Sequence, residues 1–206
     1  FDEITQIRLR TPGSLEIEAF VHGAMCVSHS GRCLLSNFMT GRDANRGNCA
    51  QACRWKYNLV EEKRPGQYMP VEETDTGTFI FNSKDLCMID HVPDLISAGI
   101  TSFKIEGRVK TEYYVACVVA AYRRAIDACF SDLGEYERIL PELREEVCKV
   151  SHRPYFTGFY YGDQKSESMN FNESGYIRDY EVSGIVTGYD YVRGCVVLSQ
   201  RNKFVI

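Results

Sequence analysis

Four cysteines between positions 26 and 53 have the side-chain type and the close spacing that metal centres and iron–sulfur clusters require. Six residues separate Cys26 from Cys33, fifteen separate Cys33 from Cys49, and three separate Cys49 from Cys53. Thiolate sulfur is a soft ligand that binds iron–sulfur clusters and zinc. We therefore expect these four side chains to hold one metal group.

The residues around the four cysteines suit a bound cluster. Glycine, alanine and serine are frequent between positions 23 and 54, so backbone N–H groups can approach sulfide closely. Arginines are interleaved with the cysteines and can offset the negative charge of a thiolate-bound cluster. They are Arg32, Arg42, Arg46 and Arg54.

Spacing alone leaves two other interpretations open. A structural zinc site also uses four cysteines, but it usually pairs them two to four residues apart, and only Cys49 and Cys53 come near that pattern. Buried cysteines without a ligand role are common. That interpretation fits Cys117, Cys129 and Cys148, which lie on predicted helices.

The elements that must position these residues alternate between strands and helices. Strand 15–21, apolar at every second position, leads into the cysteine stretch, and strand 100–105 is a short apolar run. This alternation predicts parallel β/α units and hence the α/β fold class. The predicted helices are 3–10, 84–89, 91–98, 112–130 and 135–151, and the other predicted strands are 55–60, 78–81, 181–187 and 194–199.

The pattern also predicts where the chain divides. Residues 1–151 form the β/α domain, 152–178 are an aromatic, glycine-rich linker without regular structure, and 179–206 begin a second domain with an antiparallel hairpin. Within the first domain, helix 112–130 has apolar residues at helical spacing, which predicts a buried stripe. Its members are Val115, Val118, Val119, Tyr122, Ile126 and Cys129.

The composition is that of a globular chain. The 206 residues are 44% hydrophobic and 25% charged, and no apolar run reaches the ~18 residues that a membrane span needs. The net charge of −4 gives no overall attraction to nucleic acid, so any basic surface must be local. Nine cysteines, an odd number, argue against a closed disulfide framework and favour the reducing cytoplasm. Because the chain opens at Phe1 without Met, we expect an excerpt whose remaining part packs against it.

Several segments together carry a resemblance to the collagenase-like U-32 peptidase family. They are Glu-Ala-Phe-Val-His-Gly-Ala-Met-Cys at 18–26, Ser-Gly-Arg-Cys-Leu-Leu-Ser at 30–36, Gly-Asn-Cys-Ala-Gln-Ala-Cys-Arg-Trp-Lys-Tyr at 47–57, Asn-Ser-Lys-Asp-Leu at 82–86 and Lys-Ile-Glu-Gly-Arg at 104–108. The resemblance covers roughly residues 1–160, and the long pattern of fixed Glu, His-Gly and Cys positions makes chance similarity unlikely.

The resemblance implies a fold, a cofactor and an activity. The fold would be the C-terminal part of a (β/α)8-type barrel, followed near Tyr180 by the start of a small antiparallel β-barrel. The cofactor would be a 4Fe–4S cluster on Cys26, Cys33, Cys49 and Cys53. Several branches of the family resemble oxygen-independent hydroxylases, one acting on a tRNA uridine with prephenate as oxygen donor, one on ribosomal RNA and one in ubiquinone synthesis. The Cys-x3-Cys-Arg-Trp-Lys-Tyr segment is most similar to the tRNA branch.

The fourth cluster ligand has two candidates. In the ubiquinone branch, a downstream cysteine replaces the second cysteine of the Cys-x3-Cys pair, and Cys87 would be its counterpart here. We prefer Cys53, because the pair is intact and Cys87 lies inside a predicted helix.

Charged residues alternate at the end of strand 100–105, where a barrel places its catalytic side chains. Lys104, Glu106 and Arg108 would bring two cations and a carboxylate to that edge, which suits a small anionic donor such as prephenate. A structural ion pair near the barrel rim is the alternative.

Two residues of the strand before the cysteines are further candidates. His22 could bind substrate or move a proton, because its ordinary pKa is near ~6.5, or it could support the cluster through a hydrogen bond. Glu18 lies on the same strand, on a face that the sequence does not fix.

Cations and aromatic rings mix near the second cysteine pair. This mixture suits single-stranded RNA, with cations on phosphate and rings stacked on bases, although a solvated loop has the same composition. The residues are Arg42, Arg46, Arg54, Trp55, Lys56, Tyr57, Lys63 and Arg64.

These observations favour a cluster-dependent RNA hydroxylase, most similar to enzymes that act on tRNA. The first rival is a peptidase, as the family name says, with a Cys26–His22 nucleophile and base. That pair leaves the other three cysteines unexplained, and no other protease motif is present. The second rival is a non-catalytic scaffold that carries the cluster within a hydroxylase complex.

Overall fold

The computed structural model describes residues 1–26, 33–55, 83–162 and 176–203. It also gives the backbone of two short paired strands, β2 (Asn58–Val60) and β3 (Tyr68–Pro70), and the turn residues 63, 65 and 66. The predicted strand 78–81 lies outside the described residues.

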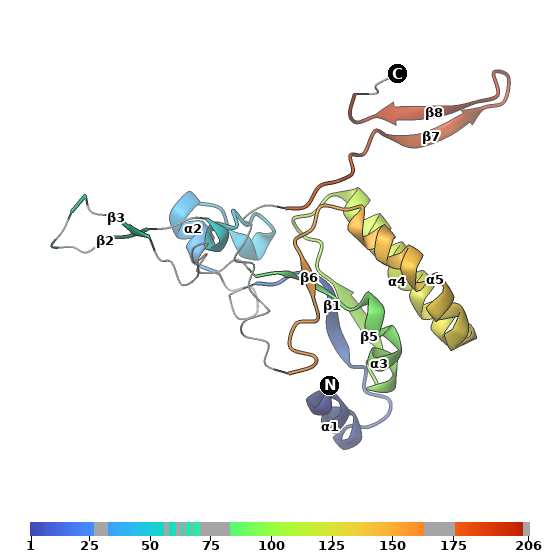
Figure 1. Ribbon diagram of the computed structural model, residues 1–206, viewed down its shortest axis with the longest axis horizontal. Coiled ribbons are helices and arrows are strands. Elements are labelled where there is room, and N and C mark those ends of the chain that lie inside the picture. Colours follow the sequence, from blue (N-terminus) through green and yellow to red (C-terminus); the bar gives the residue numbers. More distant parts are fainter. Residues whose placement is uncertain are drawn as a thin grey trace.

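A four-stranded mixed sheet forms the centre of the molecule, in the order β5-β1-β4-β6 (Figure 1). β5 runs parallel to β1 and β6 runs parallel to β4, whereas β4 is antiparallel to β1. The α/β class is therefore confirmed, but the antiparallel β4 differs from the all-parallel strands expected of a barrel. The bounds are β1 (Glu18–Ala24), β4 (Asp85–Cys87), β5 (Ser102–Ile105) and β6 (Tyr155–Phe156).

The long helices pack together beside the sheet, on the side opposite the cysteine segment (Figure 1). α4 begins at a capping threonine, whose Thr111 Oγ1 accepts a hydrogen bond from Tyr114 N at 3.2 Å. Of the helices in the described ranges, none is both long and apolar enough to cross a bilayer. The α-helices are α1 (Asp2–Arg10), α2 (Leu35–Thr40), α3 (Val92–Ser97), α4 (Glu112–Ser131) and α5 (Leu133–Cys148). The 3-10 helices are η2 (Ala44–Arg46), η3 (Ala52–Arg54) and η4 (Ile89–His91).

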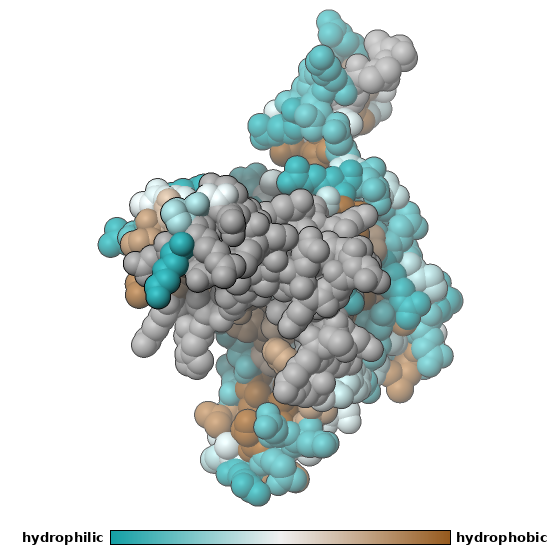
Figure 2. All heavy atoms as spheres, turned by 60° about the vertical axis from the view of Figure 1, so that its left-hand side comes forward, coloured by the Kyte–Doolittle hydropathy of each residue, from teal (hydrophilic) through white to brown (hydrophobic). Residues whose placement is uncertain are grey.

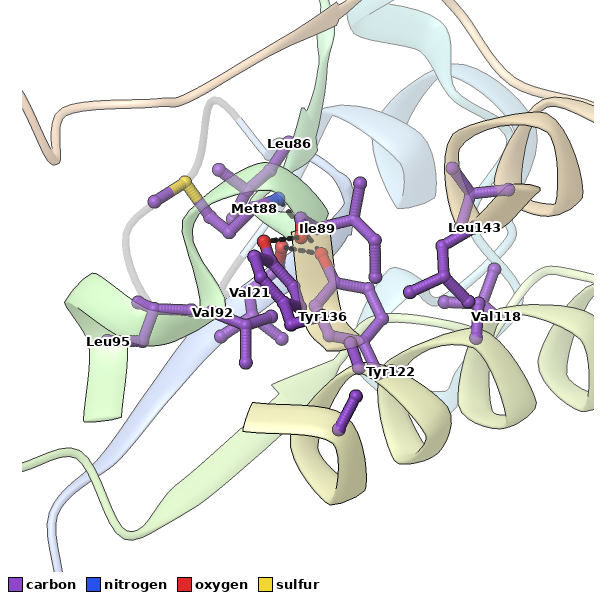
Figure 3. Packing of buried hydrophobic residues seen from close by; sticks show 14 of the residues in the cluster. Val21, Leu86, Met88, Ile89, Val92, Leu95, Val118, Tyr122, Tyr136 and Leu143 are labelled. Carbon is purple, nitrogen blue, oxygen red and sulfur yellow. Dashed lines mark hydrogen bonds between the residues drawn. The ribbon is translucent and has the colours of Figure 1, made fainter. Parts of the chain in front are cut away.

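The hydrophobic core lies between the sheet and these helices (Figure 3). Tyr122 crosses it from α4, donates to Val21 O at 2.8 Å and accepts from Met88 N at 2.9 Å. Tyr136 on α5 donates to Ile89 O at 2.8 Å. Buried hydroxyls cost free energy unless they are paired, so these bonds fix the helix pair against β1 and the segment after β4.

Three details of the fold differ from the sequence-based predictions. The helix predicted at 84–89 is wrong, because these residues form β4, which pairs with β1, and then enter η4. The linker predicted as irregular contains β6, which adds to the sheet beside β4. In the predicted stripe of α4, Val115 and Val119 are exposed, and alanines of the same helix are buried instead. The buried residues of α4 are Tyr114, Val118, Ala121, Tyr122, Ala125 and Ala128.

The predicted C-terminal hairpin is confirmed. β7 (Gly184–Asp190) and β8 (Cys195–Gln200) pair antiparallel and lie away from the central sheet (Figure 1). Apolar side chains on both strands are exposed, among them Val186 and Leu198.

Candidate cysteine-lined active site

The ends of β1 and β5 meet at an unusually close approach. The register between the two strands shifts between Phe20 and His22, and Glu106 N then donates to His22 O at 2.9 Å. Gly23 has a φ of +120°, and a Cβ at this position would lie 2.5 Å from Glu106 O. A glycine is therefore required where the chain turns from β1 toward the first cysteine.

Replacing Gly23 by alanine is expected to lower the free energy of unfolding of the full-length protein by about 2–5 kcal/mol, through backbone strain and overpacking. Gly41→Ala is the matched control, because Gly41 also has a positive φ of +70° but no atom within 4 Å of the added Cβ. It should cost only about 1–2 kcal/mol. Urea unfolding measures both, and equal losses would show that the contact with Glu106 is unimportant.

This close approach opens onto one large cavity. Its volume is about 1030 Å³. The expectation that the end of strand 100–105 and the cysteine stretch face one space is confirmed. The predicted residues that line it are His22, Cys26, Cys33, Cys49, Cys53, Lys104, Glu106 and Arg108. Toward α1 the lining becomes apolar, and apolar side chains gather at that end of the molecule in Figure 2.

Local hydrogen bonds shape the cysteine stretch. Ser36, buried in α2, donates from Oγ to Arg42 O and accepts from Ala50 N, both at 2.9 Å, which ties the two halves of the stretch together. Gln51 is the one described residue other than glycine with a positive φ, at 56°. Its N–H donates to Cys49 Sγ at 3.3 Å, so backbone N–H groups already point at sulfur here.

The sulfurs share the cavity without forming a closed site. Burial raises the pKa of Cys53, the adjacent positive charge of Arg54 opposes that shift, and nearby Cys49 and Cys26 add to it. Within the described part of the chain, no three His, Cys, Asp or Glu side chains are close enough to hold one metal ion. Binding would therefore release thiol protons and draw the cysteine segments together, as is common when metal binding is coupled to folding.

The surrounding residues fit an anionic metal group. The Arg54 side chain is only 9% exposed and lines the cavity beside the cysteines. Its Nη2 donates to Met25 O at 2.7 Å, whereas its Nη1 is buried and has no hydrogen-bond partner among the described residues. A buried positive charge directly after Cys53 suits a thiolate-bound cluster.

The charged residues at the end of β5 are held by different partners. Lys104 Nζ forms an ion pair with Glu18 Oε1 at 2.8 Å, and Glu106 Oε1 accepts from Arg108 N at 2.8 Å. Arg108 Nη1 donates to Asn45 O at 3.3 Å, linking the strand end to the cysteine stretch. Glu18 does not line the cavity, so it would act on a substrate only indirectly, by positioning Lys104.

His22 lies at the base of the cavity, 1% exposed, among tyrosines. Tyr122 Oη and Tyr155 Oη each lie 3.4 Å from one of its ring nitrogens. Burial lowers the pKa of His22 to about 3, with smaller contributions from Lys110 and His152. The ring is neutral at physiological pH, which favours a supporting role over proton transfer.

Cys87 is not among the described residues that line the cavity. It pairs with His22 in the sheet, and burial raises the pKa of its thiol to about 12. The helix expected around Cys87 is absent. Cys87 nevertheless lies in the sheet, and the cavity is lined by its neighbours Leu86 and His22 and not by Cys87 itself.

Sequence reasoning missed a buried ionic group beside the cavity. Asp85 is 1% exposed. Arg153 Nη1 lies 3.4 Å from its Oδ1, Arg54 Nη1 lies 4.0 Å from Oδ1, and Lys110 Nζ lies 4.0 Å from Oδ2. Asp85 belongs to the Asn-Ser-Lys-Asp-Leu segment that carries the family resemblance. This segment could have pointed to Asp85 as a candidate residue.

The predicted RNA-contacting residues do not share one environment. Arg46 and Trp55 are exposed, as RNA contact requires. Arg54 is buried, so the prediction that it meets phosphate at the surface is wrong. Lys63 is an exposed turn residue, and Lys56, Tyr57 and Arg64 lie outside the described residues.

The fold and the cavity define an α/β protein with a cysteine-lined site next to a charged strand end. The chain belongs to peptidase family U32, whose family model matches residues 1–170. This confirms the resemblance found in the sequence.

Individual relatives carry names of two kinds. The chain is 43% identical over 190 residues to tRNA hydroxylation protein P1 of Bacillus subtilis (strain 168), covering 92% of this chain and 44% of that protein. It is 39% identical over 137 residues to a 23S rRNA 5-hydroxycytidine synthase of Escherichia coli (strain K12), covering 66% and 20%. It is 36% identical over 165 residues to a collagenase of Porphyromonas gingivalis (strain ATCC BAA-308 / W83), covering 80% and 38%. The chain thus spans less than half the length of these relatives, and no solved structure matches it.

Proposed function

We propose that this chain is part of an iron–sulfur-dependent, oxygen-independent RNA hydroxylase that acts on a tRNA uridine in the cytoplasm. The observation that carries the proposal is the single cavity lined by four cysteines and by Lys104, Glu106 and Arg108. Relatives named for tRNA and rRNA hydroxylation support RNA as the substrate. The rest of the chain would complete the barrel and the hairpin domain.

The four cysteines would hold a 4Fe–4S cluster, and the charged strand end would hold the oxygen donor. Arg108 and Lys104 bind the carboxylates of an anionic donor such as prephenate, and Glu106 orients the backbone at Arg108 through its bond to Arg108 N. The cluster supplies one-electron and Lewis-acid chemistry when bound. Phe20 and Phe159 add apolar surface to the cavity lining, and Lys104 Nζ lies 4.9 Å from the centre of the Phe20 ring.

The test is analysis of the full-length protein purified without oxygen. About four irons per chain, together with hydroxylation of tRNA when the donor is added, would support the proposal. One zinc and no iron would contradict it. If the protein holds iron but turns over only with added proteins, it is the scaffold of a complex.

A second cavity, of about 650 Å³, suits a nucleotide of the RNA. It shares Gln51 and Val109 with the cysteine-lined cavity, so the two spaces adjoin. Its walls combine tyrosines, which can stack on bases, with cations, which can contact phosphate. They include Tyr113, Tyr180, Lys149 and Arg178.

Replacing Tyr180 by alanine in the full-length protein is expected to weaken tRNA binding about 5- to 100-fold, since one stacked base contributes ~1–3 kcal/mol. Arg178→Ala should reduce the slope of log affinity against log salt by about one, as loss of one phosphate contact does. Fluorescence anisotropy measures both effects. Arg138→Ala is the control, because Arg138 is an exposed arginine of α5 that does not line this cavity. Unchanged binding by Tyr180→Ala would rule out this cavity as the nucleotide site.

The peptidase alternative is favoured by the relative named collagenase. It would use Cys26 as nucleophile with His22 as base. His22 is buried, faces tyrosines through both ring nitrogens and has a strongly lowered pKa, so it is poorly placed for this role. Iron-independent proteolysis by the full-length protein that disappears in Cys26→Ser would nevertheless overturn the hydroxylase proposal.

A further inference from the structure

The ionic group around Asp85 is unequal in charge. Three cations, Arg54, Lys110 and Arg153, lie within 4.0 Å of this one carboxylate, and their side chains are 9%, 8% and 2% exposed. Among the described residues, no second carboxylate lies within that distance of the three. Counted over the described residues, two positive charges are left over in a region almost without solvent, where uncompensated charge is costly.

Two of the three cations have other partners. Lys110 Nζ donates to Ser151 O at 3.0 Å and lies 4.4 Å from the centre of the Tyr176 ring. The Arg153 guanidinium stacks at 4.4 Å on the same ring, and its Nη2 donates to Gln51 Oε1 at 3.4 Å. Ser151 O, Gln51 Oε1 and the face of the Tyr176 ring therefore partly stabilise the charges of Lys110 and Arg153. Arg153 Nε is also unpaired, but Arg153 does not line the cysteine cavity.

Arg54 is the member of the group that meets the cysteines. It lines the cavity and follows Cys53 directly, while its Nη1 lies 4.0 Å from Asp85 Oδ1 and has no hydrogen-bond acceptor among the described residues. Asp85 is shared with two other cations, so it does not neutralise Arg54 completely. An anion in the cavity, which Arg54 lines, would compensate the excess charge.

We propose that Arg54 is the charge-compensating residue of the cysteine site, which places a fixed positive charge and an N–H donor against the sulfurs of a bound iron–sulfur cluster. The inference rests on the proposed function and extends it. A cluster on four thiolates is an anion, and hydrogen bonds and positive charge at its sulfurs favour the reduced, more negative state. Arg54 therefore raises the reduction potential of the cluster and slows its loss.

The test compares full-length variants purified without oxygen. Arg54→Met, which keeps the length of the side chain but removes its charge, should shift the midpoint potential to more negative values in a redox titration followed by electron paramagnetic resonance. A chelator should also remove its iron about 10-fold faster, as expected when a partner of the ligands is lost. Arg54→Lys should restore most of the potential. Arg46→Ala is the matched control, because Arg46 lies on the same stretch but its side chain is 86% exposed.

Two outcomes would overturn the inference while leaving the proposed function intact. One is a midpoint potential of Arg54→Met equal to that of the iron-loaded wild type. The other is an Arg54→Lys potential shifted as far as that of Arg54→Met, which would show that charge is not responsible. If Arg54→Met fails to fold, Arg54→Gln takes its place with the same expected shift. A wild-type protein with zinc and no iron would instead contradict the proposed function itself, and the inference with it.

Discussion

Replacing Arg108 by alanine in the full-length protein is expected to abolish RNA hydroxylation while leaving the iron content unchanged. Arg108 lines the cysteine cavity but is not a sulfur ligand, and in the described part of the cysteine stretch its guanidinium is hydrogen-bonded to Asn45 O. Losing a charge-assisted hydrogen bond costs ~1.5–3 kcal/mol, so binding of the anionic donor should weaken about 10- to 100-fold. Lys104→Ala should behave in the same way. Calorimetry with prephenate and iron analysis separate the two effects.

The matched control for both variants is Arg123→Ala. Arg123 is an exposed residue of α4, paired with Asp127, and it lies outside the cavity. If Arg108→Ala and Lys104→Ala keep full hydroxylase activity, the charged end of β5 is a structural feature of the sheet edge and the donor binds elsewhere.

Serine at position 53 is expected to remove most of the iron, whereas serine at position 87 should leave it at about four per chain. Cys53 lines the cavity, close enough to Cys49 and Cys26 for their charges to raise its pKa. Cys87 lies in β4 beside His22, with a thiol whose pKa burial raises to about 12. Serine provides a poor ligand for iron, and three thiolates hold a cluster weakly. Iron analysis and the visible absorption spectrum measure the difference.

The opposite result would make Cys87 a cluster ligand and Cys53 a non-ligand. Iron lost in Cys87→Ser but kept in Cys53→Ser would place this protein with the relatives that use a downstream cysteine, and the region around β4 would then have to rearrange on cluster binding. Loss of iron in both variants calls for an unfolding measurement, because Cys87 contributes to the buried sheet and Cys53 does not.

Local patterns predicted most of the helices and the hairpin, because their apolar periodicity and turn residues are properties of short segments. β4 could not be predicted in this way. Its three residues become a strand by pairing with β1 on one side and β6 on the other, and these partners are distant in sequence. The stripe of α4 was misjudged for a similar reason. Valine is more hydrophobic than alanine, but the tertiary packing of α4, which is chiefly against α5, buries alanines and leaves Val115 and Val119 exposed.

Part of the candidate site could be predicted from the sequence. The predicted cysteines and Lys104, Glu106 and Arg108 line one cavity, whereas Glu18 does not line it. It did not reveal that His22 is enclosed by tyrosines or that Arg54 turns inward to Asp85. Burial and partner choice depend on residues such as Arg153 and Tyr122, which come from other segments and follow no local pattern.

The order of the site residues along the chain has a consequence for how the protein is made. All four cysteines lie within one stretch, between β1 and β4, whereas Arg108 follows them by more than fifty positions. Bringing the ends of the stretch 26–53 together costs only a few kcal/mol of chain entropy. All four cysteines are therefore synthesised before β5. The donor-binding wall forms only when β5 adds to β1. Under the proposed function, cofactor loading and catalytic competence would be separate stages of biosynthesis. A ribosome-bound chain ending before β5 would then bind the cluster but lack the donor-binding residues.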